Sequence, residues 1–125
     1  MKQIISTGKG PKALGPYSQA VKANGFLFTA GQGPLDPATG KLVEGDIAAQ
    51  TERVMENLKA IVEAAGSSLD RAVKANVYLK DMQDFAAMNQ VYGRYFPQNP
   101  PARTTIQAAR LPLDIGVEID LVVLA

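Results

Sequence analysis

An arginine and a glutamate near the C-terminus are the residues of this sequence best suited to chemistry. Arg103 follows a Pro-Pro-Ala segment, which fixes its backbone, and a guanidinium can bind a carboxylate through two parallel hydrogen bonds. Glu118 lies between a valine and an isoleucine, where an unpaired carboxylate is costly. Such a carboxylate either pairs with a cation or handles protons and water. These two groups are the ones in the sequence most suited to carry chemistry.

Each of these residues also has a purely structural interpretation, and three others could join them. Arg103 could form a surface ion pair worth about 0–1 kcal/mol, and Glu118 a structural salt bridge or an exposed strand end. Tyr17, in a Gly-Pro-Tyr-Ser segment, could pack or line a site. Asn89 could cap, face solvent or line a pocket. Gly31, in Gly-Gln-Gly, allows close approach of a ligand to the backbone, but no lysine or helix start follows to make a phosphate loop.

The composition excludes several classes of function. The chain has 125 residues, which predicts one domain over residues 1–125. Its 13 basic and 12 acidic residues give a net charge of +1, without the basic run of a nucleic-acid binder. The absence of cysteine and histidine excludes disulfides, thiolate nucleophiles and most metal sites. No apolar run is long enough for a membrane span, and a cytoplasmic protein is expected.

The spacing of apolar residues predicts the element order β-β-β-α-β-α-β-β. Asp46 is the expected N-cap of a first helix that ends at Gly66. Asp81 is the expected cap of a second helix that Pro97 stops. Asn24-Gly25 predicts a tight hairpin. The expected strands are a short one about residues 4–5, two between 18 and 30, and those over 73–79, 103–109 and 117–124.

This order predicts an α+β fold, in which two helices cover one face of a six-stranded mixed sheet. In the last strand, Val122 and Leu124 share a face with Glu118, opposite the face of Ile119 and Leu121. Two helices can cover only one face, so apolar residues on the other indicate that another chain covers it. The sequence therefore predicts an oligomer.

A hairpin between the last two strands would separate the two candidate residues. If it is centred near Leu113, Glu118 lies opposite about Ala108, five residues along the strand from Arg103. At about 3.3 Å per residue this is roughly 17 Å, too far for both to hold one small molecule. If Arg103 and Glu118 share a site, we expect them to share it across a subunit boundary.

Four segments carry a resemblance to a known family. They are GPYSQAV, TAGQGPLDPATGKLV, the block NLKAIVEAAGSSLDRAVKANVYLKDMQDFAAMNQVYGRYFP and PARTTIQAARLPLDIGVEI. Together they resemble the RidA subgroup of the Rid family, the reactive intermediate imine deaminases, nearly end to end. The resemblance implies a chorismate-mutase-like α+β fold and a homotrimer with its helices outside and its sheets forming a central barrel. It also implies three sites, in clefts between neighbouring subunits.

The implied reaction is hydrolysis of 2-imino acids, such as 2-iminobutanoate and 2-iminopropanoate, to 2-oxo acids and ammonia, with no metal or organic cofactor. By the matching motifs, Arg103 would bind the substrate carboxylate and Glu118 would position and activate the water. Tyr17, the Gly31 backbone and Asn89 would line the cleft.

One position departs from the family pattern, because many members carry cysteine where Thr105 stands. The change removes thiol chemistry but leaves the Thr105 backbone N–H available to the carboxylate, so we expect deaminase activity to survive. Two alternatives remain: a non-catalytic ligand-binding or regulatory trimer that uses the cleft for 2-oxo acids, and an RNA-cleaving translation inhibitor. The near-zero net charge and the absence of histidine argue against the second.

Overall fold

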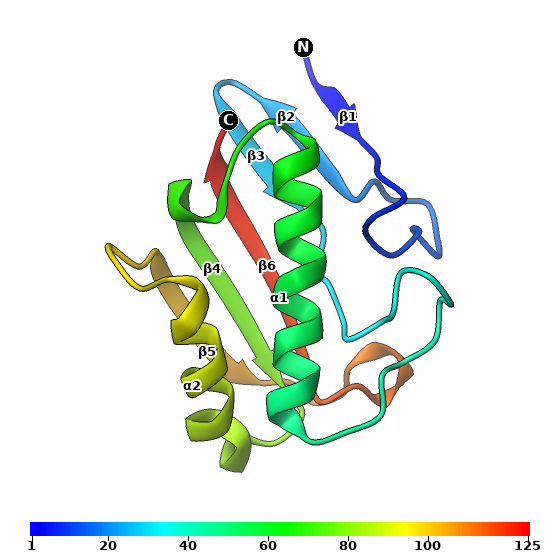
Figure 1. The fold of residues 1–125 in the computed structure, drawn as a ribbon, viewed down its shortest axis with the longest axis vertical. Coiled ribbons are helices and arrows are strands. Elements are labelled where there is room, and N and C mark those ends of the chain that lie inside the picture. The colour runs from blue at the N-terminus through cyan, green and yellow to red at the C-terminus, as the bar shows by residue number, and fades with distance from the viewer.

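A mixed six-stranded sheet carries both helices on the same face (Figure 1). The computed structural model describes all residues from 1 to 125. The predicted α+β class and element order are confirmed. The strands are β1 (Gln3–Ile5), β2 (Ala20–Ala23), β3 (Phe26–Thr29), β4 (Ala72–Leu79), β5 (Ala102–Gln107) and β6 (Val117–Leu124), and the helices are α1 (Ile47–Ala64) and α2 (Phe85–Tyr95). Neither helix has the length and apolar composition to cross a membrane.

Helix α1 begins and ends as its local signals predict. The Asp46 side chain accepts a hydrogen bond from the Ala49 N–H at 3.0 Å, which satisfies one of the free donors of the first turn. At the other end Gly66 has φ +83°, and the Ser67 N–H donates to the Val62 carbonyl at 3.1 Å. This is the Schellman arrangement that favours glycine after a helix. The helix lies across the front of the sheet in Figure 1.

Helix α2 begins later than Asp81 predicts. The Asp81 side chain accepts from the Gln83 N–H at 2.9 Å, but it caps a 3₁₀ turn, Met82–Asp84, and α2 starts at Phe85. The cap therefore satisfies the turn that precedes the helix. In Figure 1 α2 lies over β5, at the edge of the sheet.

The predicted hairpin between the last two strands is wrong. The strand order is β1-β2-β3-β6-β4-β5, so β6 pairs with β3 and β4, and β5 is an edge strand. Glu118 lies opposite Tyr78 of β4, not Ala108, and Tyr78 in turn lies opposite Ile106 of β5. The crossover through α2 lays β5 parallel to β4 at the edge of the sheet. β6 takes the central place between β3 and β4, where its alternate apolar residues are buried beneath the helices.

The two faces of the sheet differ sharply. On the helix face, Val117, Ile119 and Val123 of β6 are fully buried. On the open face, Phe28 of β3 is 46% exposed and Leu124 of β6 is 40% exposed. The predicted apolar second face is therefore present. Its cover by another chain remains a prediction.

A buried asparagine ties α1 to the segment that follows β3. The Asn57 side chain is fully buried, and its amide N–H₂ donates to the carbonyls of Gly33 at 3.2 Å and Leu35 at 2.8 Å. Its oxygen accepts from the Arg53 Nε–H at 3.1 Å. Buried carbonyls that lose their donors are costly.

We expect Asn57→Ala to lower the free energy of unfolding by about 2–4 kcal/mol, because two carbonyls lose their donor and a void forms. Urea denaturation at one fixed protein concentration measures the change. Lys59→Ala, at an exposed position of the same helix, is the matched control and should change stability by less than about 0.5 kcal/mol. Equal effects of the two substitutions would contradict the assigned role of Asn57.

Candidate functional site

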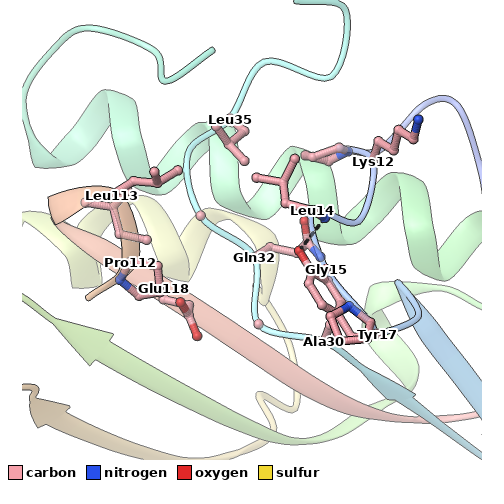
Figure 2. Close-up of a pocket in the computed structure, with 15 residues that line it drawn as sticks. Lys12, Leu14, Gly15, Tyr17, Ala30, Gln32, Leu35, Pro112, Leu113 and Glu118 are labelled. Carbon is pink, nitrogen blue, oxygen red and sulfur yellow. Dashed lines mark hydrogen bonds between the residues drawn. The ribbon is translucent and has the colours of Figure 1, made fainter. Parts of the chain in front are cut away.

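A cavity of about 520 Å³ lies between the loop before β2, the segment after β3 and the turn before β6 (Figure 2). Tyr17 comes from the first of these, Gly31 from the second, and Leu113 from the third. Glu118 joins them from β6. Three of the predicted site residues, Tyr17, Gly31 and Glu118, thus line the same cavity.

Glu118 is a half-buried carboxylate without a partner. Its neighbours on β6, Val117 and Ile119, face the core, so the alternation of the strand turns Glu118 to the open face. It forms no ion pair, since the single ion pair of the chain joins Lys80 to Asp114 at 2.9 Å, and it makes no side-chain hydrogen bond. Burial raises the pKa of Glu118, and repulsion from the Asp120 carboxylate raises it further. The interpretation as a structural salt bridge does not hold within the chain.

Gly31 makes room for this carboxylate. A Cβ at position 31 would collide with the Glu118 carboxylate, and it would lie 2.9 Å from Cδ. The next residue, Gln32, donates its N–H to the Ile119 carbonyl at 2.9 Å and accepts from the Ile119 N–H at 3.2 Å. The Gly31–Gly33 backbone is therefore fixed against β6 beside Glu118.

Tyr17 lines the cavity with its hydroxyl already bound to its own loop. The oxygen accepts from the Leu14 N–H at 3.1 Å, which closes a turn, and the hydroxyl proton remains free to donate. The side chain is 50% exposed. Figure 2 shows its ring beside Gly15 and Ala30.

Gln19 holds the start of this loop, and sequence reasoning missed it. The side chain is 5% exposed. Its amide N–H₂ donates to the Pro11 carbonyl at 2.8 Å and the Thr7 carbonyl at 3.1 Å, and its oxygen accepts from the Thr7 N–H at 2.7 Å. The only available signal was an amide residue directly before an apolar strand.

Arg103 lines a second cavity, of about 440 Å³, at the end of α2. It lies opposite Ala75 of β4, which is buried beneath the helices, so Arg103 faces the helix side. Its guanidinium carbon lies 4.8 Å from the Tyr92 ring centroid and 5.5 Å from that of Phe85. The guanidinium forms no ion pair and no hydrogen bond within the chain, so the surface ion pair does not hold either.

Three buried polar atoms near Arg103 have no hydrogen-bond partner: Asn89 Oδ1, the Tyr92 hydroxyl and Thr105 Oγ1. Asn89 and Tyr92 line the cavity with Arg103, and Thr105 lies two residues along β5 on the same face. Burial raises the pKa of Tyr92 to about 12, while Arg103 opposes the shift. Unpartnered buried polar atoms are rare in proteins, and a ligand bound in this cavity would supply partners for Asn89 and Tyr92.

Phe85 and Tyr92 are the functional candidates that sequence reasoning missed here. Both recur at helical spacing among the apolar residues of the second helix, and that pattern alone indicates core packing. Their contact with Arg103 depends on β5 lying beneath α2, which no local signal reports.

The structure divides the predicted site residues into two groups within one chain. Tyr17, Gly31 and Glu118 line one cavity, and Asn89 and Arg103 line the other, with Thr105 on the same face of the sheet as Arg103. One cavity offers a carboxylate with a raised pKa, and the other a guanidinium whose donors are all free. No cluster of three or more acidic side chains is arranged to hold a metal ion.

Glu118→Gln should leave the isolated subunit at least as stable at neutral pH. A raised folded-state pKa means that the ionised carboxylate favours the unfolded state, so this contribution to stability falls as pH rises through the folded-state pKa. Glutamine removes the penalty. We expect the variant to gain stability over wild type near pH 7 and to match it at about pH 3, where both side chains are neutral. Denaturation across this range, with the exposed Glu63→Gln as control, measures the effect. A variant less stable at pH 7 would contradict the unpaired state of Glu118.

Gly31→Ala should displace the Glu118 carboxylate without unfolding the chain, because the added methyl meets the side-chain end and not the core. We expect unchanged secondary structure by circular dichroism and an altered apparent pKa of Glu118 by ¹³C NMR of the carboxyl carbon. Gly8→Ala, where no atom lies within 4 Å of the new Cβ, is the control. An unchanged Glu118 titration in Gly31→Ala would show that the two residues do not touch.

Comparison with known proteins places the chain in a family. The sequence profile described as "Endoribonuclease L-PSP" matches residues 7–125. A RutC family protein of Pyrococcus horikoshii is 56% identical over 98% of this chain and 97% of its own length. Reactive Intermediate Deaminase A of Arabidopsis thaliana, a chloroplast protein, is 45% identical over 97% of this chain and 65% of its own. The crystal structure of E. coli TdcF with bound serine has 40% identity and a TM-score of 0.94, covering 98% of both chains. The chain is a member of the Ribonuc_L-PSP family, the Rid family that the sequence segments indicated.

Proposed function

We propose that this protein is a hydrolytic deaminase of 2-imino acids that works at clefts between the subunits of a homotrimer. The observation that carries the proposal is the pair of unpartnered charges. Arg103 and Glu118 lie in different cavities and on different faces of one sheet. Family membership and the deaminase relative support the reaction class.

A second subunit would bring these two charges together. Each charge is costly while partly buried and unpaired, and the exposed apolar residues of the open face supply the driving force for association. In the proposed trimer the open faces would form a central barrel with the helices outside. The Glu118 cavity of one subunit would then meet the Arg103 cavity of its neighbour. Cyclic symmetry would repeat this site once at each boundary.

The groups fit hydrolysis of a protonated imine. The Arg103 guanidinium would hold the substrate carboxylate, together with the Thr105 backbone N–H. Glu118 would take a proton from a water molecule as the water oxygen attacks C2, which gives a carbinolamine. The Glu118 carboxyl would then return the proton to nitrogen. As the C–N bond breaks and the C2 carbonyl forms, Glu118 would take the hydroxyl proton of the carbinolamine and pass it to the departing ammonia, which leaves as ammonium. A raised pKa brings the carboxylate nearer the value that suits this transfer at neutral pH.

Tyr17 and Asn89 would complete the cleft from opposite sides. Tyr17 has a free hydroxyl proton, and Asn89 has an unpartnered oxygen. Asn89 Oδ1 could accept from the N–H of the protonated imine, and the Tyr17 hydroxyl could donate to the carbinolamine oxygen. Because the imine carbon is already electrophilic, orientation of substrate and water supplies most of what the reaction needs. We propose 2-iminobutanoate and 2-iminopropanoate as substrates, with no metal or organic cofactor.

A second candidate is a trimer that binds 2-oxo acids or amino acids in the same cleft without turning them over. The relative E. coli TdcF has been crystallised with bound serine, which favours a site for small 2-substituted carboxylates. Turnover separates the two candidates, since both predict binding through Arg103. The family description also names an endoribonuclease, and RNA affinity that falls steeply with salt would support that activity.

Arg103→Ala should abolish the acceleration of imine loss. In a coupled assay, threonine dehydratase supplies 2-iminobutanoate, and its decay is followed with and without the protein. We expect the variant to leave the decay at the uncatalysed rate, because the substrate carboxylate loses its anchor. Arg110→Ala, at an exposed position seven residues away, should keep wild-type activity. An Arg103→Ala protein as fast as wild type would show that the anchor is misassigned.

Mixing two inactive variants tests whether the site crosses a subunit boundary. In a ring of subunits, a site built from Arg103 of one chain and Glu118 of the next is intact when a Glu118→Gln subunit meets an Arg103→Ala subunit in the right order. Random co-refolding at equal amounts should therefore restore about a quarter of wild-type activity. Each variant refolded alone should stay inactive. No recovery in mixed trimers, verified by native mass spectrometry, would place both residues in one chain's site.

A further inference from the structure

Two aromatic rings are the only partners that the Arg103 guanidinium has within the chain. Its guanidinium makes no hydrogen bond or ion pair within the chain, yet it lies 4.8 Å from the Tyr92 ring centroid and 5.5 Å from the Phe85 centroid. A free arginine side chain samples many rotamers, and a partner is needed to hold one of them. We propose that Phe85 and Tyr92 form an aromatic clamp that positions Arg103 for its carboxylate ligand. The identity of the carboxylate ligand in this inference rests on the proposed function.

Helix α2 places both rings over the arginine. Phe85 is the first residue of the helix, and Tyr92 follows seven residues later, two turns along the same face. Tyr92 is 5% exposed and packs against Phe96, with centroids 4.8 Å apart. Its ring therefore cannot easily turn away. Phe85 is half-buried at the margin of the core.

An aromatic side chain is a better partner than an acidic one for an arginine that binds a carboxylate ligand. A ring face attracts the cation through its quadrupole and uses none of the guanidinium N–H donors. An aspartate or glutamate in the same place would neutralise the charge and occupy two donors. The clamp thus fixes the orientation of Arg103 and leaves five donors for the incoming anion. A lysine at position 103 would not reproduce this arrangement, because its ammonium lacks the planar group that stacks on rings and presents two parallel donors to a carboxylate.

The clamp has a spectroscopic signature that does not depend on any ligand. Protons of the Arg103 side chain above ring faces should resonate upfield of their usual positions. The upfield shift should persist in Tyr92→Phe, which keeps the ring, and decrease in Tyr92→Leu and Phe85→Leu. Normal shifts in the wild-type protein would overturn the clamp, whether or not the protein deaminates imines.

Affinity for 2-oxobutanoate, a stable product of the proposed reaction, tests what the clamp does. By calorimetry we expect Tyr92→Leu to bind about 2- to 30-fold more weakly than Tyr92→Phe, which keeps the ring, and Phe85→Leu to bind more weakly than wild type by a similar factor. If Tyr92→Phe loses as much affinity as Tyr92→Leu, the hydroxyl and not the ring matters, and the clamp is refuted. Phe85→Leu, at a less buried position, keeps the test available if Tyr92→Leu fails to fold.

A double-mutant cycle separates positioning from general destabilisation. In an Arg103→Ala background, Phe85→Leu should weaken 2-oxobutanoate binding no further, because the group that it positions is gone. An additive loss would show that Phe85 acts by another route. If Arg103→Ala itself leaves the affinity unchanged, the proposed ligand site is wrong, and the NMR shifts still decide whether the clamp exists.

Discussion

The register of β6 is the constraint on which the fold and the candidate site both depend. Alternate residues of this strand, from Val117 to Val123, are buried beneath the helices. Because successive side chains of a strand point to opposite faces, Glu118 must then lie on the open face. A slip of one residue would drive two carboxylates, Glu118 and Asp120, into the core. The register that buries the apolar residues of β6 therefore also places the Glu118 carboxylate on the open face.

Local signals in the sequence predicted most of the elements but not the sheet order. The Asn24-Gly25 turn, the Asp46 cap and the Gly66 end each act over a few residues, and each is found where the sequence placed it. The pairing of β6 with β4 is a contact between segments about forty residues apart. The short link from β5 to β6 favours a hairpin, but the alternate apolar residues of β6 are buried beneath the helices in the middle of the sheet, between β3 and β4. The predicted hairpin failed for this reason.

The candidate site shows the same division between local and distant information. Arg103 and Glu118 could be identified because a fixed arginine and an acid in an apolar strand are unusual wherever the strand lies. Tyr92 could not, because an aromatic residue on an apolar helical stripe is also what core packing requires. Gln19 and Asn57 were missed because they stabilise the fold through hydrogen bonds to backbone carbonyls, for example those of Pro11 and Gly33, that lie 8 and 24 residues away. Amide side chains that hydrogen-bond to loops follow no periodic pattern in a sequence, so periodicity does not reveal them.

The chain forms a single ion pair, between Lys80 and Asp114, and this bears on how its stability responds to salt. Twenty-five charged side chains, 13 basic and 12 acidic, form one exposed pair within the chain, and such a pair adds little to stability. Added salt therefore has only one contact ion pair to weaken within the subunit.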